Sequence, residues 1–253
     1  AGNTRVYGAY AGGISEDKVE EIALKSNGEA VLFGYTRSYA GAGGFPSVNA
    51  YQANNGAPAG GPRDAFMMRI NAAGSALLNA TFLGTAAEDV SRNPTPFDMN
   101  TQHKSGGVDV NANGDIAIAM VTDATTLATV SSVDPSFNGD GGSPAGLGDV
   151  YIAVFNPTGT TLSFTTYLGG FNHDYPTGGI RFDPSNPLCI VVGGSNHSDQ
   201  VTFPVTAGAY LTNRGATTTN DQGFITKYCD VVLPVELLMF TATLNASGDV
   251  LTE

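Results

Sequence analysis

The chain has 253 residues, a net charge of −12 and only 13% charged residues, together with 33 Gly and 13 Pro. An acidic surface repels phosphate backbones and anionic lipid, so the composition disfavours binding to nucleic acid or to a membrane surface. The hydrophobic content of 42% excludes the low-hydrophobicity signature of disorder. No apolar run reaches the ~18 residues that span a bilayer. Frequent Gly and Pro predict many short strands joined by turns.

The pattern of apolar and turn residues predicts five strands in the first third of the chain. They are Arg5–Ala11, Val19–Ser26, Ala30–Arg37, Asp64–Asn71 and Ala76–Gly84. Asn27-Gly28 between the second and third is a strong signal for a tight hairpin. A long excursion with two Gly clusters, residues 38–63, separates the third strand from the fourth.

The rest of the chain repeats this order of strands and turns. The predicted strands are 106–112, 115–122, 149–156, 161–170, 178–184, 188–195 and 223–229. Asn113-Gly114 and Ser185-Asn186 predict the equivalent hairpins. No helical period lasts more than one turn, because Gly and Pro are spread too evenly.

One segment recurs as a pattern of apolar, polar and turn residues. DAFMMRINAAGSAL at Asp64–Leu77 returns as DVYIAVFNPTGTTL at Asp149–Leu162. The strand end YAGG at Tyr10 returns as FLGT at Phe82 and as YLGG at Tyr167, after steps of 72 and 85 residues. FPSVNAY at 45–51 also returns as FPVTAGAY at 203–210. Matching steps at several anchors indicate a tandem array of one β-unit.

Four antiparallel strands repeated in tandem are the layout of a propeller blade. The repeats also resemble the bacterial seven-bladed β-propeller repeat family, with its YLGG strand end, Asn-Gly hairpin, FP loop and DAF strand. The matching residues are Tyr167–Gly170, Ile22–Gly28, Phe33-Gly34, Phe203–Tyr210, Asp64–Gly74 and Asp149–Gly159. The middle copy departs most, since Met120 replaces the strand-end Gly and VDPSFNGDGG replaces the FP loop. The resemblance therefore implies a partial β-propeller with one remodelled loop.

The units divide residues 1–229 into the last strand of a preceding blade and three blades. The expected boundaries are 1–13, 14–85, 86–170 and 171–229. The third unit lacks a fourth strand, while Arg5–Ala11 is a fourth strand without a unit. Either Arg5–Ala11 belongs to an upstream blade or it closes the third blade as a clasp. We favour the upstream blade, because propellers typically need 4–8 blades and three would leave no room for the inner strands.

Residues 230–253 do not follow the repeat pattern. LPVELLMFTA resembles the stretch that opens a β-sandwich module late in surface proteins exported by the bacterial type IX secretion system. Leu238–Leu244 and Val250–Glu253 are predicted strands joined by a turn at Asn245–Gly248. The resemblance implies a longer exported protein at the cell surface or outside the cell, with the secretion machinery as a partner of this region.

The two cysteines predict a disulfide. Cys189 lies at the start of one strand of the third unit, and Cys229 lies at the end of the next. Adjacent antiparallel strands bring such ends together. The alternative is a pair of free thiols, which an exported location disfavours.

Calcium is the one cofactor that the residues suggest, at Asp134, Asn138, Asp140 and Asp149 around the remodelled excursion. Oxygen-rich Gly loops can hold calcium in extracellular proteins, but a solvated loop is the interpretation we favour. The segment 109–115 matches the first half of a calcium loop. Met120 stands where the closing Glu is needed, so a tight turn explains it better.

The sequence predicts no catalytic residues. Ser195-Asn-His197-Ser-Asp199 contains triad residue types, yet a triad is assembled from distant segments. His103 and His173 lie in no known catalytic motif. Glu20-Glu21 are expected on opposite faces of a strand, which argues against a shared site.

Two further groups of residues are expected to be structural. Glu88-Asp89 and His173-Asp174 fall in the polar turn that follows the YLGG-type strand end. Aromatic residues recur at equivalent strand positions, where packing between sheets is expected more than ligand stacking. They are Phe33, Phe66, Phe82, Tyr151, Phe155, Phe164, Tyr167 and Phe224.

We therefore expect a non-enzymatic, secreted or cell-surface β-propeller module with a structural, adhesive or ligand-binding role. Expected partners are other blades of a longer polypeptide, the secretion machinery and a surface protein or glycan. The alternative is a segment of an extracellular hydrolase whose catalytic site lies outside this chain. Because one fold hosts many functions, this expectation rests on analogy.

Overall fold

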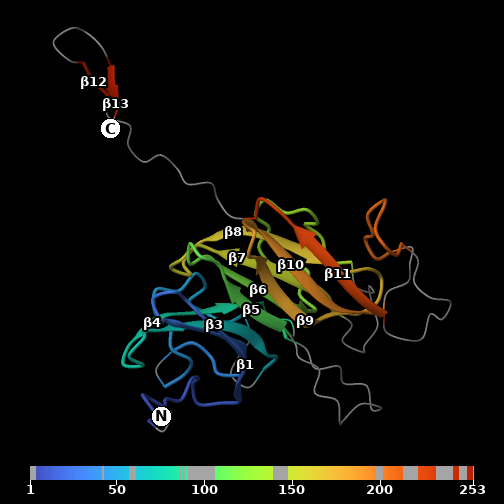
Figure 1. The fold of residues 1–253 in the computed structure, drawn as a ribbon. Helices are drawn as coiled ribbons and strands as arrows, with labels where there is room; N and C mark the ends of the chain where they lie inside the picture. Colours follow the sequence, from blue (N-terminus) through green and yellow to red (C-terminus); the bar gives the residue numbers. More distant parts are fainter. Residues whose placement is uncertain are drawn as a thin grey trace.

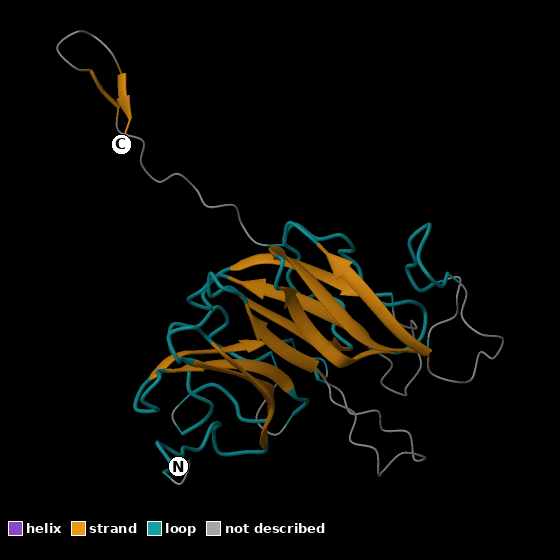
Figure 2. Cartoon of the chain, in the orientation of Figure 1, coloured by secondary structure: helices purple, strands orange, loops and turns teal. Residues whose placement is uncertain are grey.

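The computed structural model describes residues 4–41, 43–56, 61–85, 87, 89–90, 106–138, 148–197, 202–212, 222–231, 242–244 and 250–252. Within these residues the chain is all-β, with three antiparallel sheets, a separate strand pair and no helix (Figures 1 and 2). The prediction of an all-β fold is confirmed.

The three sheets follow one another along the chain. The first has the order β1-β2-β3-β4 and the second the order β5-β6-β7-β8. The first contains β1 (Asp17–Leu24), β2 (Ala30–Thr36), β3 (Asp64–Ile70) and β4 (Leu77–Leu83). The second contains β5 (Gly106–Val110), β6 (Ile116–Thr122), β7 (Asp149–Phe155) and β8 (Leu162–Leu168). Each unit of the repeat is thus one meander of neighbouring strands.

The third sheet has three strands in the described part of the chain, in the order β11-β10-β9. They are β9 (Asp174–Asp183), β10 (Asn186–Asn196) and β11 (Gln222–Tyr228). β9 begins four residues before its predicted start, because Asp174 and Tyr175 still pair with Asn196 and Ser195 of β10. The remaining strands of the units agree with prediction to within about two residues at most ends.

The prediction of a strand at Arg5–Ala11 is wrong for this structure. Residues 4–11 have no strand, and most of them are exposed. The segment lies near the first sheet, where the ring of Tyr7 approaches Gly74. A strand requires a neighbour that accepts and donates its backbone hydrogen bonds, and the segment has none among the described residues. It therefore does not act as a clasp on the third sheet.

Tight turns close one end of each sheet, as predicted. Gly28 and Gly114 have φ of 83° and 88°, a conformation that costs Gly little. Asn71 and Asn156 organise the turns after β3 and β7 in the same way. Each accepts hydrogen bonds at Oδ1 from the backbone N–H groups four and five residues ahead. The side chain thus replaces backbone partners in the turn.

The sheets stack face to face, with an apolar core at each junction. One cluster joins the first and second sheets through residues such as Phe33, Tyr151 and Tyr167. A second joins the second and third sheets through residues such as Ile152 and Ile190. The first strands lie closest together, since β1 contacts β5 and β5 contacts β9 (Figure 1).

A third apolar cluster covers the other face of the first sheet. Phe45, from the excursion between β2 and β3, lies against the rings of Phe66 and Phe82 at centroid distances of 5.0 and 4.9 Å. Val48 of the same excursion exchanges backbone hydrogen bonds with Ala80 of β4. The excursion therefore takes the place of a neighbouring sheet on this face.

Residues 242–244 and 250–252 form the antiparallel pair β12 (Ala242–Leu244) and β13 (Val250–Thr252). These strands overlap the two predicted near the end of the chain. The predicted turn at Asn245–Gly248 lies outside the described residues. A sandwich module at 230–253 stays a prediction.

Candidate functional site

The three long excursions leave the sheets at the same end, between β2 and β3, β6 and β7, and β10 and β11. We call this the long-loop end. Binding and catalytic residues commonly lie on loops held by a rigid scaffold, so this end is the candidate functional region.

An aspartate repeats at the long-loop end, where each unit begins. Asp17, Asp89 and Asp174 each accept a hydrogen bond at Oδ2 from the backbone N–H four residues earlier, at 2.6–2.8 Å. At Oδ1 each accepts a hydrogen bond from the end of the second strand of its own unit. The donors are Thr36, Thr122 and Asn196. We call the three residues the repeat aspartates.

Two of the repeat aspartates also connect neighbouring sheets. The backbone N–H of Asp89 donates to the carbonyl of Arg63, just before β3, at 2.8 Å. The backbone N–H of Asp174 donates to the carbonyl of Gly148, just before β7, at 2.8 Å. Each residue thus binds the previous sheet through its backbone and its own sheet through its side chain. The predicted polar turn at these positions is a junction between sheets.

A second carboxylate lies beside each of these junctions. A Cβ on Gly84 would lie 2.4 Å from Oδ1 of Asp64 and 2.7 Å from Oδ2 of Asp89. A Cβ on Gly169 would likewise lie 2.3 Å from Asp149 and 2.9 Å from Asp174. Only Gly leaves room for the two carboxylates at this position. All four are at most 1% exposed, so a substrate in solvent does not reach them.

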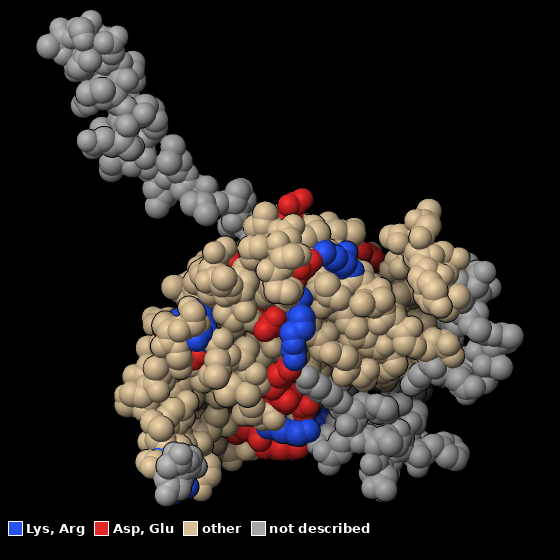
Figure 3. Space-filling view, in the orientation of Figure 1, with Lys and Arg blue, Asp and Glu red and all other residues tan. Residues whose placement is uncertain are grey.

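The first strands are joined by a line of charged side chains, Glu21, Asp109 and Arg181, which we call the charged seam. Glu21 Oε2 accepts a hydrogen bond from the backbone N–H of Val108 in β5 at 3.0 Å, and Oε1 lies 2.9 Å from the guanidinium of Arg181. Asp109 accepts one from the backbone N–H of Phe182 in β9 at 2.8 Å. Figure 3 shows acidic and basic groups gathered over these strands. The carboxylates satisfy backbone donors at the edges of the sheets.

The calcium candidates are partly brought together. Asn138 donates from its backbone N–H to Asp149 Oδ2 and from its side chain to Asp134 Oδ2, both at 2.7 Å. Asp134 Oδ1 accepts two hydrogen bonds from Ser136. Asp140 lies outside the described residues. These contacts are those of an Asx turn, and the described residues contain no cluster of three or more metal-binding side chains. Calcium binding here stays a prediction.

The half-calcium-loop at 109–115 forms the hairpin between β5 and β6. Asn111 accepts the backbone N–H of Gly114 at 3.0 Å through its carbonyl and that of Asp115 at 2.9 Å through Oδ1. Asp109 is engaged by β9, and Met120 is buried in the core. The expectation of a tight turn agrees with this geometry.

The described histidines form a stacked pair. The rings of His173 and His197 lie 4.3 Å apart at an interplanar angle of 18°, and the backbone N–H of His197 donates to the carbonyl of His173. Ser195 lies in β10 and pairs with β9 and β11. Asp199 and His103 lie outside the described residues. Sequence reasoning missed the pair, because the two residues lie 24 positions apart.

The two neighbouring glutamates, Glu20 and Glu21, form ion pairs with different basic residues. Glu20 is the extra residue of a β-bulge in β1 and lies 2.7 Å from Lys18. Glu21 faces Arg181 instead. Of the other predicted carboxylate pair, Asp89 is a repeat aspartate and Glu88 lies outside the described residues. Neither pair presents two carboxylates to a common ligand among the described residues.

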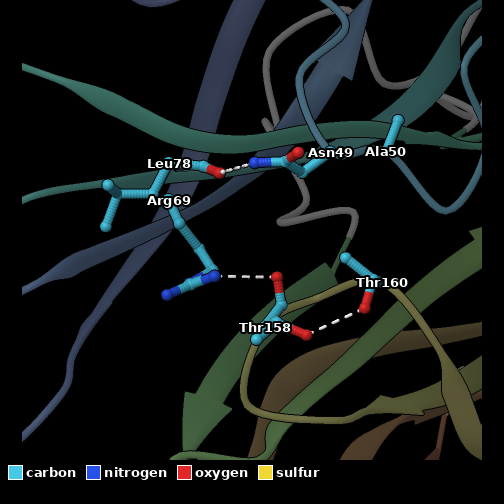
Figure 4. Close-up of a pocket in the computed structure, with 6 residues that line it drawn as sticks. All are labelled: Asn49, Ala50, Arg69, Leu78, Thr158 and Thr160. Atoms are coloured by element: carbon cyan, nitrogen blue, oxygen red, sulfur yellow. Dashed lines mark hydrogen bonds between the residues drawn. The ribbon is translucent and has the colours of Figure 1, made fainter.

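A hollow of about 450 Å³ lies between the first and second sheets at the tight-turn end (Figure 4). Arg69 of β3 reaches across it, donating to the carbonyl of Thr158 at 2.7 Å and to Glu29 Oε2 at 2.6 Å. Burial raises the pKa of Glu29, but the hydrogen bonds from Arg69 and Asn27, together with the positive charges of Arg69 and Lys25, leave the pKa below its usual value. The guanidinium is thus held by protein groups, and the hollow is a junction between sheets.

The predicted disulfide is present. Cys189 of β10 and Cys229, the residue that follows β11, are bonded, with their Cα atoms 4.0 Å apart. Cys229 occupies the position of Asn71 and Asn156 in the other units. The same position of the repeat therefore holds an asparagine that organises a turn in two units and a disulfide-bonded cysteine in the third.

The repeated aromatic residues lie in the three apolar clusters. Seven of the eight are buried, and Phe224 is half-buried against the junction of the second and third sheets. Burial raises the pKa of Tyr167 to about 12 and also raises that of Tyr151. Six of these residues pack between sheets, as expected, whereas Phe66 and Phe82 pack between the first sheet and its long excursion.

No family model matches the chain, and no curated protein matches it either. Among the described residues, no helix has the length and apolar character required to cross a membrane. The resemblance to the propeller repeat and to type IX cargo therefore stays a prediction.

Proposed function

We propose that this chain is a non-enzymatic module of an exported bacterial protein, built from consecutive propeller-type blades. One observation carries the proposal. The repeat aspartates and the charged seam connect each sheet to the next in the same way, so the recurring polar residues serve assembly of the blades. The side-by-side first strands fit the inner strands of a propeller.

The long-loop end is the proposed ligand-binding region. Val133 and Phe171 are 69% and 57% exposed on two different connections of this end. Binding residues commonly lie on loops held by a rigid scaffold, so we infer that these two side chains contact a protein or a glycan. The disulfide supports an oxidising location such as the cell surface or the extracellular space.

The rival function is hydrolysis by the paired carboxylates at Gly84 and Gly169. The same pair occurs in two successive units and is buried in both, which favours a structural role. The test uses the purified protein with glycoside, ester and peptide substrates, comparing the wild type with Asp64→Asn and Asp149→Asn. We expect no turnover by any of the three and a lower Tm for each variant. Turnover that disappears at unchanged Tm would establish catalysis.

The proposed delivery to the cell surface has a separate test. Residues 232–253 are removed in the producing bacterium, and the protein is located by protease accessibility on intact cells. A control keeps the length but replaces residues 233–238 with Gly and Ser. We expect both variants to fold and to stay inside the cell. Normal surface delivery of the truncated chain would contradict a sorting role for this tail.

A further inference from the structure

The third sheet ends in a strand whose outer edge has no partner among the described residues. In the first two sheets the equivalent edges of β3 and β7 are paired with β4 and β8. The third sheet stops at β11 in the described part of the chain. A free edge presents a row of backbone N–H and C=O groups that can accept another strand.

The chain leaves β11 on the side away from this edge. The backbone N–H of Val231 donates to the carbonyl of Leu188 in β10 at 3.1 Å. The carbonyl of Val231 accepts from the hydroxyl of Ser163 in β8 at 3.0 Å. The disulfide holds Cys229 against β10 as well. Residues 229–231 therefore run toward β10 and β8, and they do not return along β11.

Residues 5–11 carry the sequence pattern of the missing strand. β4 and β8 span Leu77–Leu83 and Leu162–Leu168, and residues 5–11 stand at the same place one step of 72 earlier. The following Gly and the repeat aspartate keep the same spacing in all three copies. Yet Val6 and Tyr10 are 83% and 106% exposed. The segment has the sequence of a fourth strand but no sheet.

An aromatic contact completed in the first sheet is incomplete in the third. In the first sheet, Phe45 of the FP loop packs on both Phe66 of β3 and Phe82 of β4. In the third, Phe203 of the second FP loop packs on Phe224 of β11 at 5.2 Å. The residue of segment 5–11 that corresponds to Phe82 is Tyr10.

We propose that β11 accepts residues 5–11 of a second copy of this chain as an antiparallel fourth strand. The registers of β3 with β4 and of β7 with β8 place Tyr10 opposite Phe224 and Ala9 opposite Ile225. Ile225, now 79% exposed, gains a cross-strand neighbour, and Tyr10 joins Phe203 and Phe224. The proposal rests on the blade organisation proposed above.

A second copy fits better than the same chain. Ala11 packs against the apolar cluster on the outer face of the first sheet, and the second sheet lies between that sheet and β11. Residues 12–16 join the segment to β1 at Asp17, and the six Cα–Cα steps from residue 11 to residue 17 span at most roughly 22 Å when fully extended. Two spacings between packed sheets amount to about 20 Å, and a strand on the outer edge of β11 lies three strand spacings, about 14 Å, to the side of the first strands. The combined distance of roughly 24 Å exceeds the reach of the linker.

The first test adds a synthetic peptide of residues 4–13 to the intact protein. We expect peptide binding to slow hydrogen exchange of the β11 amides and to dissociate dimers seen by sedimentation. The matched peptide with Tyr10→Ser should bind at least about tenfold more weakly, because it loses the aromatic contact. Equal binding of the two peptides, or no protection of β11, would overturn the proposal.

The second test fixes the register by cross-linking. Chains with Ala9→Cys are mixed with chains with Ile225→Cys under mild oxidation, since the native cysteines are bonded to each other. We expect a covalent dimer, and at least about tenfold slower cross-linking with Thr226→Cys, whose side chain points to the opposite face of the strand. Equal rates would overturn the proposed register.

Two further outcomes would show that the edge of β11 pairs with a segment other than residues 5–11 of a second copy. Cross-linking within one chain that carries both Ala9→Cys and Ile225→Cys, at high dilution, would assign the edge to the same chain. Peptide binding that appears only after removal of residues 232–253 would assign the edge to those residues. If the peptide does not bind while hydrogen exchange in β5–β8 remains slow, the pairing of β11 with residues 5–11 is wrong but the proposed blade organisation is not contradicted. Fast exchange throughout β5–β8 in the intact protein would count against the blade proposal itself.

Discussion

The second and third sheets derive from the same repeat but reach stability differently. Every residue of β6, β7 and β8 is buried, because the second sheet has a neighbour on each face. β11 alternates between half-buried and exposed residues, because one face of the third sheet is open. The disulfide is found in the third sheet.

This difference shows how covering both faces changes what a sheet requires. Two apolar junctions stabilise the second sheet without a covalent link. The third has one junction, and the side chains on its open face include Lys227 and Ile225. Lys227 pairs with Asp183, and together with Ser185 it lowers the pKa of that carboxyl. A covalent bond and surface ion pairs take the place of a second apolar junction there.

Removal of the disulfide should have the largest effect. A bridge closing 40 residues contributes about 3–4 kcal/mol in the chain-entropy model. We expect the double variant Cys189→Ser, Cys229→Ser to lose about that much stability, with faster hydrogen exchange concentrated in β9–β11. Reduction of the wild type is the control. An equal loss of protection in β5–β8 would show that the two sheets unfold as one unit.

The repeat aspartates test whether the junctions between sheets are equivalent. Asp89→Ala and Asp174→Ala each remove two hydrogen bonds to a buried carboxylate, so we expect about 2–4 kcal/mol of destabilisation. Asp17→Ala should cost less than about 1–2 kcal/mol, since its contacts are partly exposed. Urea denaturation measures all three. A cost at Asp17 equal to that at Asp89 would show that junction burial contributes little.

The turn asparagines test how the turns after β3 and β7 are held. Asn156→Ala removes the side-chain acceptor of two turn N–H groups, and we expect a loss of about 1–2 kcal/mol. Asn156→Asp keeps the acceptor and is the matched control, with a smaller expected loss. Thermal unfolding monitored by circular dichroism gives the comparison. An unchanged Tm in Asn156→Ala would mean that pairing of β7 with β8 is enough to form the turn.

Alkaline pH should have the smallest effect near neutrality and a clear one above pH 10. Burial raises the pKa of Tyr167 to about 12 and also raises those of Tyr151 and Tyr228. The folded state therefore keeps its protons where the unfolded state, near pKa 10, loses them. Stability is fully present below about pH 10 and falls as pH rises toward 12. Tyrosinate absorbance measured beside circular dichroism tests this, and titration of Tyr167 near pH 10 in the folded protein would contradict it.

The sequence by itself determined the strands, the hairpins and the disulfide. Alternation of apolar residues, Asn-Gly turns and the recurrence of Asp64–Leu77 at Asp149–Leu162 are local signals, and they survive in the structure because neighbouring strands pair along the chain. The excess strand at Arg5–Ala11 shows the limit of such signals. Its sequence matches β4 and β8, but a strand forms only where a partner edge is within reach.

Only the tertiary structure decided the roles of the polar residues. Glu21 and Arg181 lie 160 positions apart, and His173 and His197 form a stack that no motif announces. Asp89 reads as a turn residue, yet it binds two sheets at once because stacking brings Arg63 and Thr122 to it. These contacts depend on how closely the sheets approach. That distance is set by packing across their apolar faces, which no short segment of sequence encodes.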